Sequence, residues 1–155
     1  MGDGNNVLHD LTIGAIKQGC HVNIATPEGY RPNAEVMEMA VELAKEHGVR
    51  LTLTDDPRKA VAGAHVVVTD TWISMGQEEE AKRRKVDFVG YQVTSEMMGL
   101  ADPSAVFLHC LPRKPEEVSD EVFYSEKSLV FAEAENRMWT VMAVTLELLG
   151  KKWEH

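Results

Sequence analysis

The segment at residues 66–76 constrains the fold more than any other part of the sequence, because it joins an apolar strand to a polar loop. Residues 66–68 are three valines in succession, a β-branched run typical of parallel strands covered on both faces. Asp70 follows almost at once. Ligands of open α/β sheets bind beyond the carboxyl ends of the strands. The segment therefore predicts a buried parallel strand that delivers Asp70 to a ligand; a carboxylate that only caps the next helix is the alternative.

Strands and helices are predicted to alternate along the whole chain. Apolar or alternating segments predict strands at residues 21–26, 50–54, 66–70, 106–109 and 129–131. Helical spacing and capping residues predict helices at residues 8–16, 32–47, 57–62, 78–84, 94–98 and 133–149, the one at 78–84 being a charged, exposed face. Such alternation predicts an α/β fold in one domain, with a doubly wound, mostly parallel sheet and helices on both faces.

The chain opens on a glycine-rich loop at residues 2–6, with only Met1 before it. In a βα unit such a loop normally follows a strand. We therefore expect the first strand to lie outside this chain, a flexible terminus being the alternative. Without that strand two neighbouring strands lack a partner, and association with another polypeptide would cover their edges. In the alternative arrangement, the strand at 21–26 or 50–54 moves beside 66–70.

Charge and composition exclude several classes of protein. The net charge is −9, from 25 acidic and 16 basic residues, whereas a nucleic-acid footprint needs clustered Lys and Arg. No apolar run approaches the ~20 residues of a membrane span. The first residues do not resemble a signal or transit peptide, and two cysteines favour a reducing compartment over a disulfide framework. We expect a cytoplasmic protein, or one of the mitochondrial matrix if the source is an animal, without nucleic-acid or membrane partners.

Polar clusters at residues 3–6, 70–76, 109–113 and 133–137 are predicted to meet at the carboxyl edge of the sheet. Cys110 is the sharpest single candidate, because neighbouring charge can tune a thiol for chemistry. His109, Arg113 and Arg137 are the expected sources of positive charge, and a buried, inert cysteine is the alternative. No Cys or His pair has metal-ligand spacing, so no metal is predicted. Cys20 is interpreted as a packing residue.

Two further features, the Leu111-Pro112 bond and the position of Arg137, each allow two interpretations. Leu111-Pro112 lies between a strand and a polar turn, where a cis bond is compatible with the sequence, although most X-Pro bonds are trans. Arg137 lies near a predicted helix start, against the preference of the helix dipole. It therefore suggests a bound anion, or else a local salt bridge with Glu133 or Glu135.

Four motifs of the chain resemble ornithine carbamoyltransferase. They are Asp-Gly-Asn-Asn at residues 3–6, Asp-Thr-Trp-Ile-Ser-Met-Gly at 70–76, Phe-Leu-His-Cys-Leu-Pro-Arg at 107–113 and Glu-Asn-Arg at 135–137. They stand in the family's order and spacing, and the resemblance covers essentially the whole chain. The Ser-Met-Gly and His-Cys-Leu-Pro motifs are highly specific, since an aspartate-using relative is expected to differ at both. The resemblance implies a Rossmann-like fold.

The resemblance also implies a reaction and an ornithine site. The family joins carbamoyl phosphate to the δ-amine of L-ornithine, giving L-citrulline and phosphate, without a metal or an organic cofactor. Carried over by motif, Asn6 would bind the α-carboxylate of ornithine and Asp70 its α-ammonium. Ser74 and Met75 would line the same pocket from a mobile loop. These residue types match the opposite charges of an amino acid.

On the carbamoyl side, the resemblance assigns three residues. Cys110 would sit beside the reacting amine, and Leu111 would offer its backbone carbonyl to the carbamoyl NH₂. Arg137 would polarise the carbamoyl oxygen, which stabilises the charge that develops on attack.

One departure from the family is large. The Ser-Thr-Arg-Thr-Arg and His-Pro-x-Gln motifs of its carbamoyl phosphate domain do not occur in residues 1–155. We therefore expect residues 1–155 to be the ornithine-binding domain alone, inactive by itself and a homo-oligomer in its assembled form. The alternatives are an amino-acid-binding module without turnover and, more remotely, a nucleotide-binding α/β domain, for which the N-terminal loop is too short.

Overall fold

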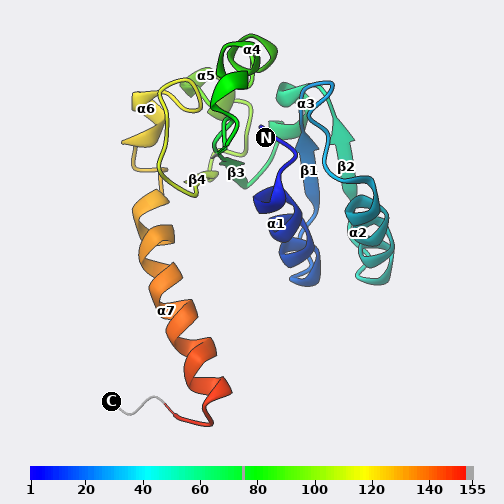
Figure 1. Ribbon diagram of the computed structural model, residues 1–155, viewed down its shortest axis with the longest axis vertical. Helices are drawn as coiled ribbons and strands as arrows, with labels where there is room; N and C mark the ends of the chain where they lie inside the picture. Colours follow the sequence, from blue (N-terminus) through cyan, green and yellow to red (C-terminus); the bar gives the residue numbers. More distant parts are fainter. Residues whose placement is uncertain (75, 153–155) are drawn as a thin grey trace.

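Helices and short strands alternate in the computed structural model of the protein, which describes residues 1–74 and 76–152 (Figure 1). The elements are α1 (Asn6–Lys17), β1 (Val22–Ala25), α2 (Ala34–Glu46), β2 (Leu51–Thr54), α3 (Pro57–Val61), β3 (Val66–Thr69), the 3₁₀ helix η1 (Glu78–Glu80), α4 (Ala81–Asp87), α5 (Ser95–Met98), β4 (Val106–His109), α6 (Asp120–Phe123) and α7 (Val130–Leu148). The predicted α/β fold with parallel strands is confirmed. Within the described residues no helix is both long enough and apolar enough to cross a membrane.

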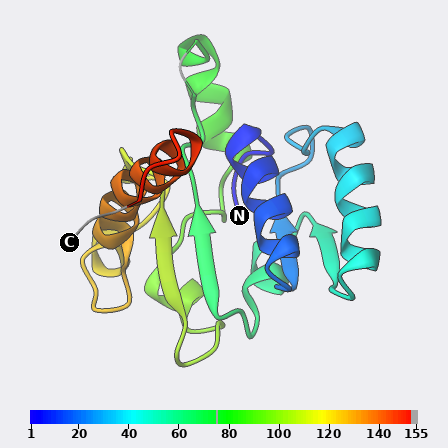
Figure 2. The same cartoon turned by 90° about the horizontal axis from the view of Figure 1, so that it is seen from below.

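The strands form two parallel pairs, β1 with β2 and β3 with β4. Figure 2 shows all four arrows pointing the same way, with the N-terminus between β3 and β1. Met1 donates its amine to the carbonyl oxygen of Val68 at 2.7 Å, and Gly2 donates its N–H to that of Ala25 at 3.0 Å. The first two residues therefore join the pairs at their carboxyl ends. Among the described residues neither β1 nor β2 pairs with β3, so the rearranged sheet is not what the chain forms.

Polar side chains cap the helices and so fix where the loops leave them. Asn5, Asn33, Asp56 and Thr94 each accept a hydrogen bond from a backbone N–H two or three residues further on. The caps at Asp56 and Thr94 that the sequence predicted are confirmed. Asn5 caps α1 at the carboxyl edge of the strands, where its side chain also reaches Asp70.

Three groups of buried side chains form the core. The largest lies around β3 and β4 and includes Val67, Phe107, Met97 and Met98. The two methionines were predicted to fill the core, and both are buried. A second group is mainly aromatic and contains Trp72, Phe88 and Tyr91. A small aliphatic group joins α1 to α2 through Ile16, Ala40 and Ala44.

The predicted strand at residues 129–131 is wrong, because α7 already begins at Val130 rather than at Glu133. The extended backbone lies just before it. Phe107 donates its N–H to the carbonyl oxygen of Lys127, and Leu129 donates to that of Phe107, at 2.8 and 2.9 Å. This parallel bridge beside β4 ends at Leu129, from which the chain turns directly into the helix.

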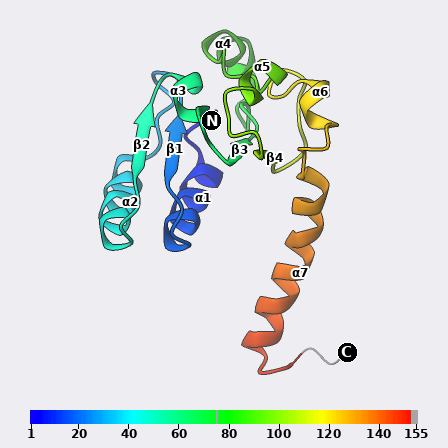
Figure 3. The same ribbon diagram turned by 180° about the vertical axis from the view of Figure 1, so that it is seen from behind.

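Helix α7 runs away from the rest of the chain, as Figures 1 and 3 show from opposite sides. Most of its apolar side chains are exposed, from Trp139 at 45% to Leu148 at 82%. Two expectations of burial fail. Val66 is half exposed at the outer end of β3, and Cys20 is exposed in the turn beyond the end of α1.

Candidate functional site

Three of the four predicted polar clusters meet around the carboxylate of Asp70 at the carboxyl edge, and the fourth reaches the same edge through Glu133, which accepts the N–H of His109. Asn5, at the start of α1, donates its side-chain amide to Asp70 Oδ2 at 2.8 Å. Cys110, directly after β4, donates its thiol to Asp70 Oδ1 at 2.7 Å. Parallel strands that end at one edge therefore bring together residues 5, 70 and 110. The Asn5 contact was not predicted. Of the two adjacent asparagines, the resemblance gave a role in ornithine binding to Asn6 alone.

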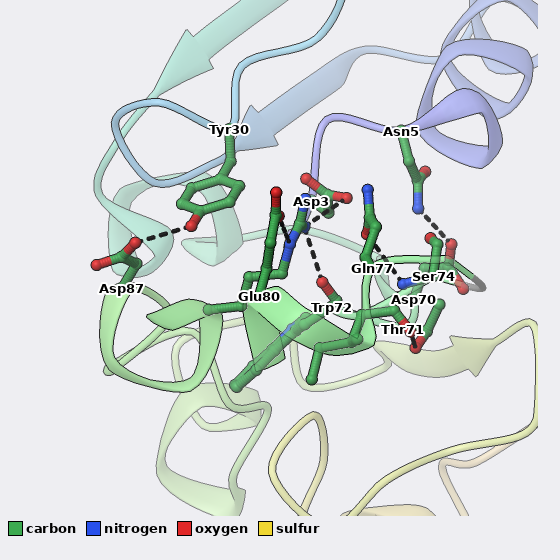
Figure 4. A network of polar contacts seen from close by, with 12 residues as sticks. Asp3, Asn5, Tyr30, Asp70, Thr71, Trp72, Ser74, Gln77, Glu80 and Asp87 are labelled. Atoms are coloured by element: carbon green, nitrogen blue, oxygen red, sulfur yellow. Dashed lines mark hydrogen bonds and ion pairs between the residues drawn. The ribbon is translucent and has the colours of Figure 1, made fainter. Parts of the chain in front are cut away.

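The other residues assigned to ornithine lie around this centre. Asn6 is the first residue of α1 and is exposed at the same helix start. Ser74 is half buried, and its backbone N–H donates to Gln77 Oε1 at 3.1 Å (Figure 4). Met75 lies outside the described residues. The exposed Asn6 and the partly buried Ser74 thus lie in the same two segments as Asn5 and Asp70, which contact each other.

Cys110 is exposed rather than buried, yet partial desolvation of its thiol raises the pKa to about 12, and the hydrogen bond to Asp70 adds to that rise. The negative charges of Asp70, Glu133 and Glu117 act in the same direction. The expectation of positive charge around Cys110 is therefore wrong. At neutral pH Cys110 is a thiol that donates a hydrogen bond, which is a poor state for a nucleophile.

The two arginines expected beside Cys110 are engaged or placed elsewhere. The guanidinium of Arg113 donates to the carbonyl oxygen of Val118 at 3.1 Å, pairs with Asp120 and lies 4.6 Å from the centre of the Phe123 ring. Arg137 lies two turns inside α7 rather than at its start, because the helix begins at Val130. Within residues 1–74 and 76–152 no ion pair joins it to either neighbouring glutamate.

A fully buried pair, His109 and Glu117, connects the loops behind this edge. Their side chains approach to 3.0 Å, from Nε2 to Oε2. Because Nδ1 of His109 accepts the N–H of Leu111 at 3.0 Å, the ring proton sits on Nε2 and is donated to Glu117. Glu117 also accepts the backbone N–H groups of Lys114 and Trp72, at 2.7 and 3.2 Å. One carboxylate thus ties the loop after β3 to the loop after β4.

The turn after β4 has an unusual backbone. The Leu111-Pro112 bond is cis, and Leu111 has a φ of 29°, which few residues other than glycine adopt. The N–H of His109 donates to Glu133 Oε2 at 3.0 Å, so the first turn of α7 contacts this strand end. Burial raises the pKa of Glu133, and that N–H partly offsets the rise.

The N-terminal loop is fitted closely against its neighbour. Gly4 donates its N–H to the carbonyl oxygen of Tyr30 at 2.9 Å. A Cβ atom on Gly4 would lie 2.4 Å from the backbone nitrogen of Pro32, far inside contact distance. Only glycine therefore fits there without a shift of the loop that carries Asn5. Among residues 1–74 and 76–152, no group of three His, Cys, Asp or Glu side chains could hold a metal ion.

Alkylation should reveal the protonation state of Cys110. At pH 8 a thiol with a pKa of about 12 is ionised in roughly one molecule in ten thousand. Both cysteines are exposed, so the raised pKa of Cys110 should decide the order: iodoacetamide should label Cys20 first and Cys110 at least about tenfold more slowly. Labelling of Cys110 should rise steadily up to pH 11, and D70N should accelerate it at pH 8 without affecting Cys20. Mass spectrometry of the peptides measures both labelling rates, and equal rates for the two cysteines would contradict the raised pKa of Cys110.

The model of one family matches residues 1–148: aspartate/ornithine carbamoyltransferase, Asp/Orn binding domain. The chain therefore belongs to the aspartate/ornithine carbamoyltransferase family, as this domain. Within the family, its similar relatives are ornithine carbamoyltransferases. The mitochondrial enzyme of Aquarana catesbeiana is 60% identical over 149 residues, which is 96% of this chain and 43% of that protein. The enzyme of Wolinella succinogenes is 52% identical over 98% of this chain and 50% of its own length.

Solved structures give the same result. Ornithine carbamoyltransferase from Pyrococcus furiosus superposes with a TM-score of 0.88 at 46% identity, covering 94% of this chain and 47% of that one. The anabolic enzyme from Campylobacter jejuni superposes with a TM-score of 0.91 at 36% identity, covering 97% and 50%. The chain thus spans about half the length of the relatives it matches, and the Rossmann-like fold implied by the resemblance is confirmed.

Proposed function

We propose that this chain is the ornithine-binding half of an enzyme that transfers a carbamoyl group from carbamoyl phosphate to the δ-amine of L-ornithine. The contact of Asp70 with both Asn5 and Cys110 carries the proposal, since it gathers a carboxylate, an amide and a thiol where an α/β sheet binds its ligand. The relatives named ornithine carbamoyltransferase support the choice of substrate.

In the proposed reaction the deprotonated δ-amine attacks the carbonyl carbon of carbamoyl phosphate. A C–N bond forms, the bond from carbon to the phosphate oxygen breaks, and the proton that the amine loses passes to the departing phosphate, which gives citrulline and phosphate. Arg137 would polarise the carbamoyl oxygen, and the backbone carbonyl of Leu111 would hold the carbamoyl NH₂. Cys110 would position the amine as a hydrogen-bonding thiol, in keeping with its raised pKa.

Ornithine itself would be held by its charged ends. Asp70 would pair with the α-ammonium, Asn6 would bind the α-carboxylate, and Ser74 and Met75 would line the pocket. The exposure of Asn6 supports this assignment, because its amide lies open to solvent at the start of α1. No metal or organic cofactor is part of the proposal.

Carbamoyl phosphate would be held mainly by a second polypeptide segment, since the chain spans about half the length of its relatives. We further propose that the complete enzyme is a homo-oligomer, which the exposed apolar side chains of α7 support. Its compartment would be the cytoplasm or, as for the relatives named mitochondrial, the mitochondrial matrix.

A citrulline assay tests this function. The chain is assayed alone and after mixing with the carbamoyl-phosphate-binding half of a relative. We expect no citrulline from the chain alone and turnover from the mixture. Calorimetric binding of ornithine without turnover in any mixture would instead identify an amino-acid-binding module.

The substitution D70N should weaken ornithine binding by about one to two orders of magnitude, because a hydrogen bond to a charged group is worth about 1.5–3 kcal/mol. The KM for carbamoyl phosphate should stay unchanged. The matched control is D102N, whose carboxylate bonds Ser104 before β4 and lies at the opposite end of the strands. Equal losses for both substrates would argue against Asp70 as the ornithine residue.

A further inference from the structure

The backbone of Trp72 is held from both sides by buried side chains of opposite charge. Glu117 accepts its N–H at 3.2 Å, and Nη1 of Arg84 donates to its carbonyl oxygen at 2.9 Å. The side chain of Arg84 is 8% exposed and that of Glu117 is fully buried. Trp72 lies midway between Asp70 and Ser74 in the sequence, two residues from each. The contacts of Glu117 and Arg84 therefore fix the backbone between two of the proposed ornithine contacts.

Arg84 also reaches the N-terminal loop through Asp3, which Figure 4 labels. Its Nη1 bonds Asp3 Oδ2 at 3.1 Å, and its Nε bonds Glu80 Oε2 at 2.9 Å. Asp3 lies two residues before Asn5, the partner of Asp70, and its side chain is only 10% exposed. A single guanidinium in α4 therefore joins the loop before α1 to the connection between β3 and α4.

This burial corrects the interpretation of residues 78–84 as a uniformly exposed face. Arg83 fits that interpretation, because 81% of its side chain is exposed and it pairs with Asp87 on its own helix. Arg84, one position further on, points inward and lies 4.8 Å from the centre of the Tyr30 ring. The two neighbouring arginines thus provide a matched pair: Arg84 is buried in the network, whereas Arg83 lies at its exposed margin, on Asp87, which also accepts the hydroxyl of Tyr30.

The charges of the network depend on one another. Burial lowers the pKa of Arg84, but the bonds to Glu80 and Asp3 more than offset this and raise it above its usual value. Burial raises the pKa of Asp3, and Arg84 partly offsets that rise. Buried ion pairs add little net stability compared with apolar packing. A planar guanidinium fork does supply direction, because it fixes a carbonyl and a carboxylate relative to each other.

We propose that Arg84 is a positioning residue for ornithine, which sets the connection between β3 and α4 against the N-terminal loop so that Asp70, Ser74 and Asn6 face one ligand. The inference rests on the proposed function. It adds a residue that touches no substrate and acts through Trp72 and Asp3.

The test compares R84M with R83M on the same chain. Ornithine binding is measured by titration calorimetry, and amide hydrogen exchange of the peptides around Trp72 by mass spectrometry. R84M should raise the ornithine dissociation constant and the exchange rate by about tenfold or more, as for the loss of a charge-assisted hydrogen bond. R83M should change neither, and R84K should fall between wild type and R84M, because it keeps the charge without the fork.

A second variant separates positioning from plain stabilisation. If Arg84 acts through Asp3, then D3N should also weaken ornithine binding, and combining D3N with R84M should add little to R84M alone. Should R84M fail to fold, R84K and D3N carry the same comparison. Unchanged ornithine affinity in R84M, or a loss of melting temperature with affinity intact, would overturn the proposal.

The proposed function can fail separately. If the wild-type chain binds no ornithine, alone or with the carbamoyl-phosphate-binding half of a relative, the substrate assignment falls. The exchange comparison then still decides whether Arg84 holds the connection, and equal exchange in R84M and wild type would overturn that as well.

Discussion

Replacing Glu117 with alanine should lower the free energy of unfolding by about 3 kcal/mol or more, because three donors lose their shared acceptor. The reason is the number of donors that lose their acceptor. The N–H groups of Trp72 and Lys114 and the ring N–H of His109 all donate to this one carboxylate. Each buried donor left unpaired costs about 1–3 kcal/mol. Urea denaturation measures the loss.

The neighbouring residue is the control. Glu116 forms a partly exposed ion pair with Lys85 at 2.8 Å, so E116A should cost no more than about 1 kcal/mol. E117Q should fall between the two, because a carboxamide keeps one acceptor and loses the charge. Equal stabilities of E116A and E117A would show that Glu117 does not hold the loops.

Sequence reasoning predicted the parts of the site that follow from strand periodicity. Residues that come directly after parallel strands reach a common edge, so the meeting of Asp70 and Cys110 follows from the positions of β3 and β4 alone. Helix capping is equally local, which is why the predicted caps at Asp56 and Thr94 agree with the structure.

Contacts between distant segments were missed. Arg84 and Asp3 are 81 positions apart, and Trp72 and Glu117 are 45 apart. In the sequence, Arg84 and Glu117 both lie in runs of charged residues that are typical of solvated faces. Nothing local distinguishes Arg84 from Arg83, because its burial depends on where Trp72 and the N-terminal loop lie in the folded chain. The sign of the charge around Cys110 was missed for the same reason.

The open edges of β1 and β3 should make the purified chain associate with itself. Among the described residues β1 pairs only with β2 and β3 only with β4, and between them the backbone of Met1 and Gly2 alone bonds their facing edges. Open strand edges are templates for pairing with another chain. Several unpaired backbone groups, at about 1–3 kcal/mol each when buried, rival the roughly 5–15 kcal/mol that stabilises a domain. The purified chain should therefore associate at micromolar concentration, as measured by sedimentation velocity.

Helix α7 offers a second surface, and substitutions can separate the two. Val141 and Leu148 are 59% and 82% exposed, so replacing both with lysine should leave the fold intact and abolish any association through α7. Val66, half exposed in β3, is the matching position on the strand side, and V66K places a charge there. We expect V66K to reduce association more than the α7 pair does, because open strand edges leave backbone groups unpaired whereas α7 satisfies its own. A monomeric wild-type chain with a cooperative melt would contradict association through either surface.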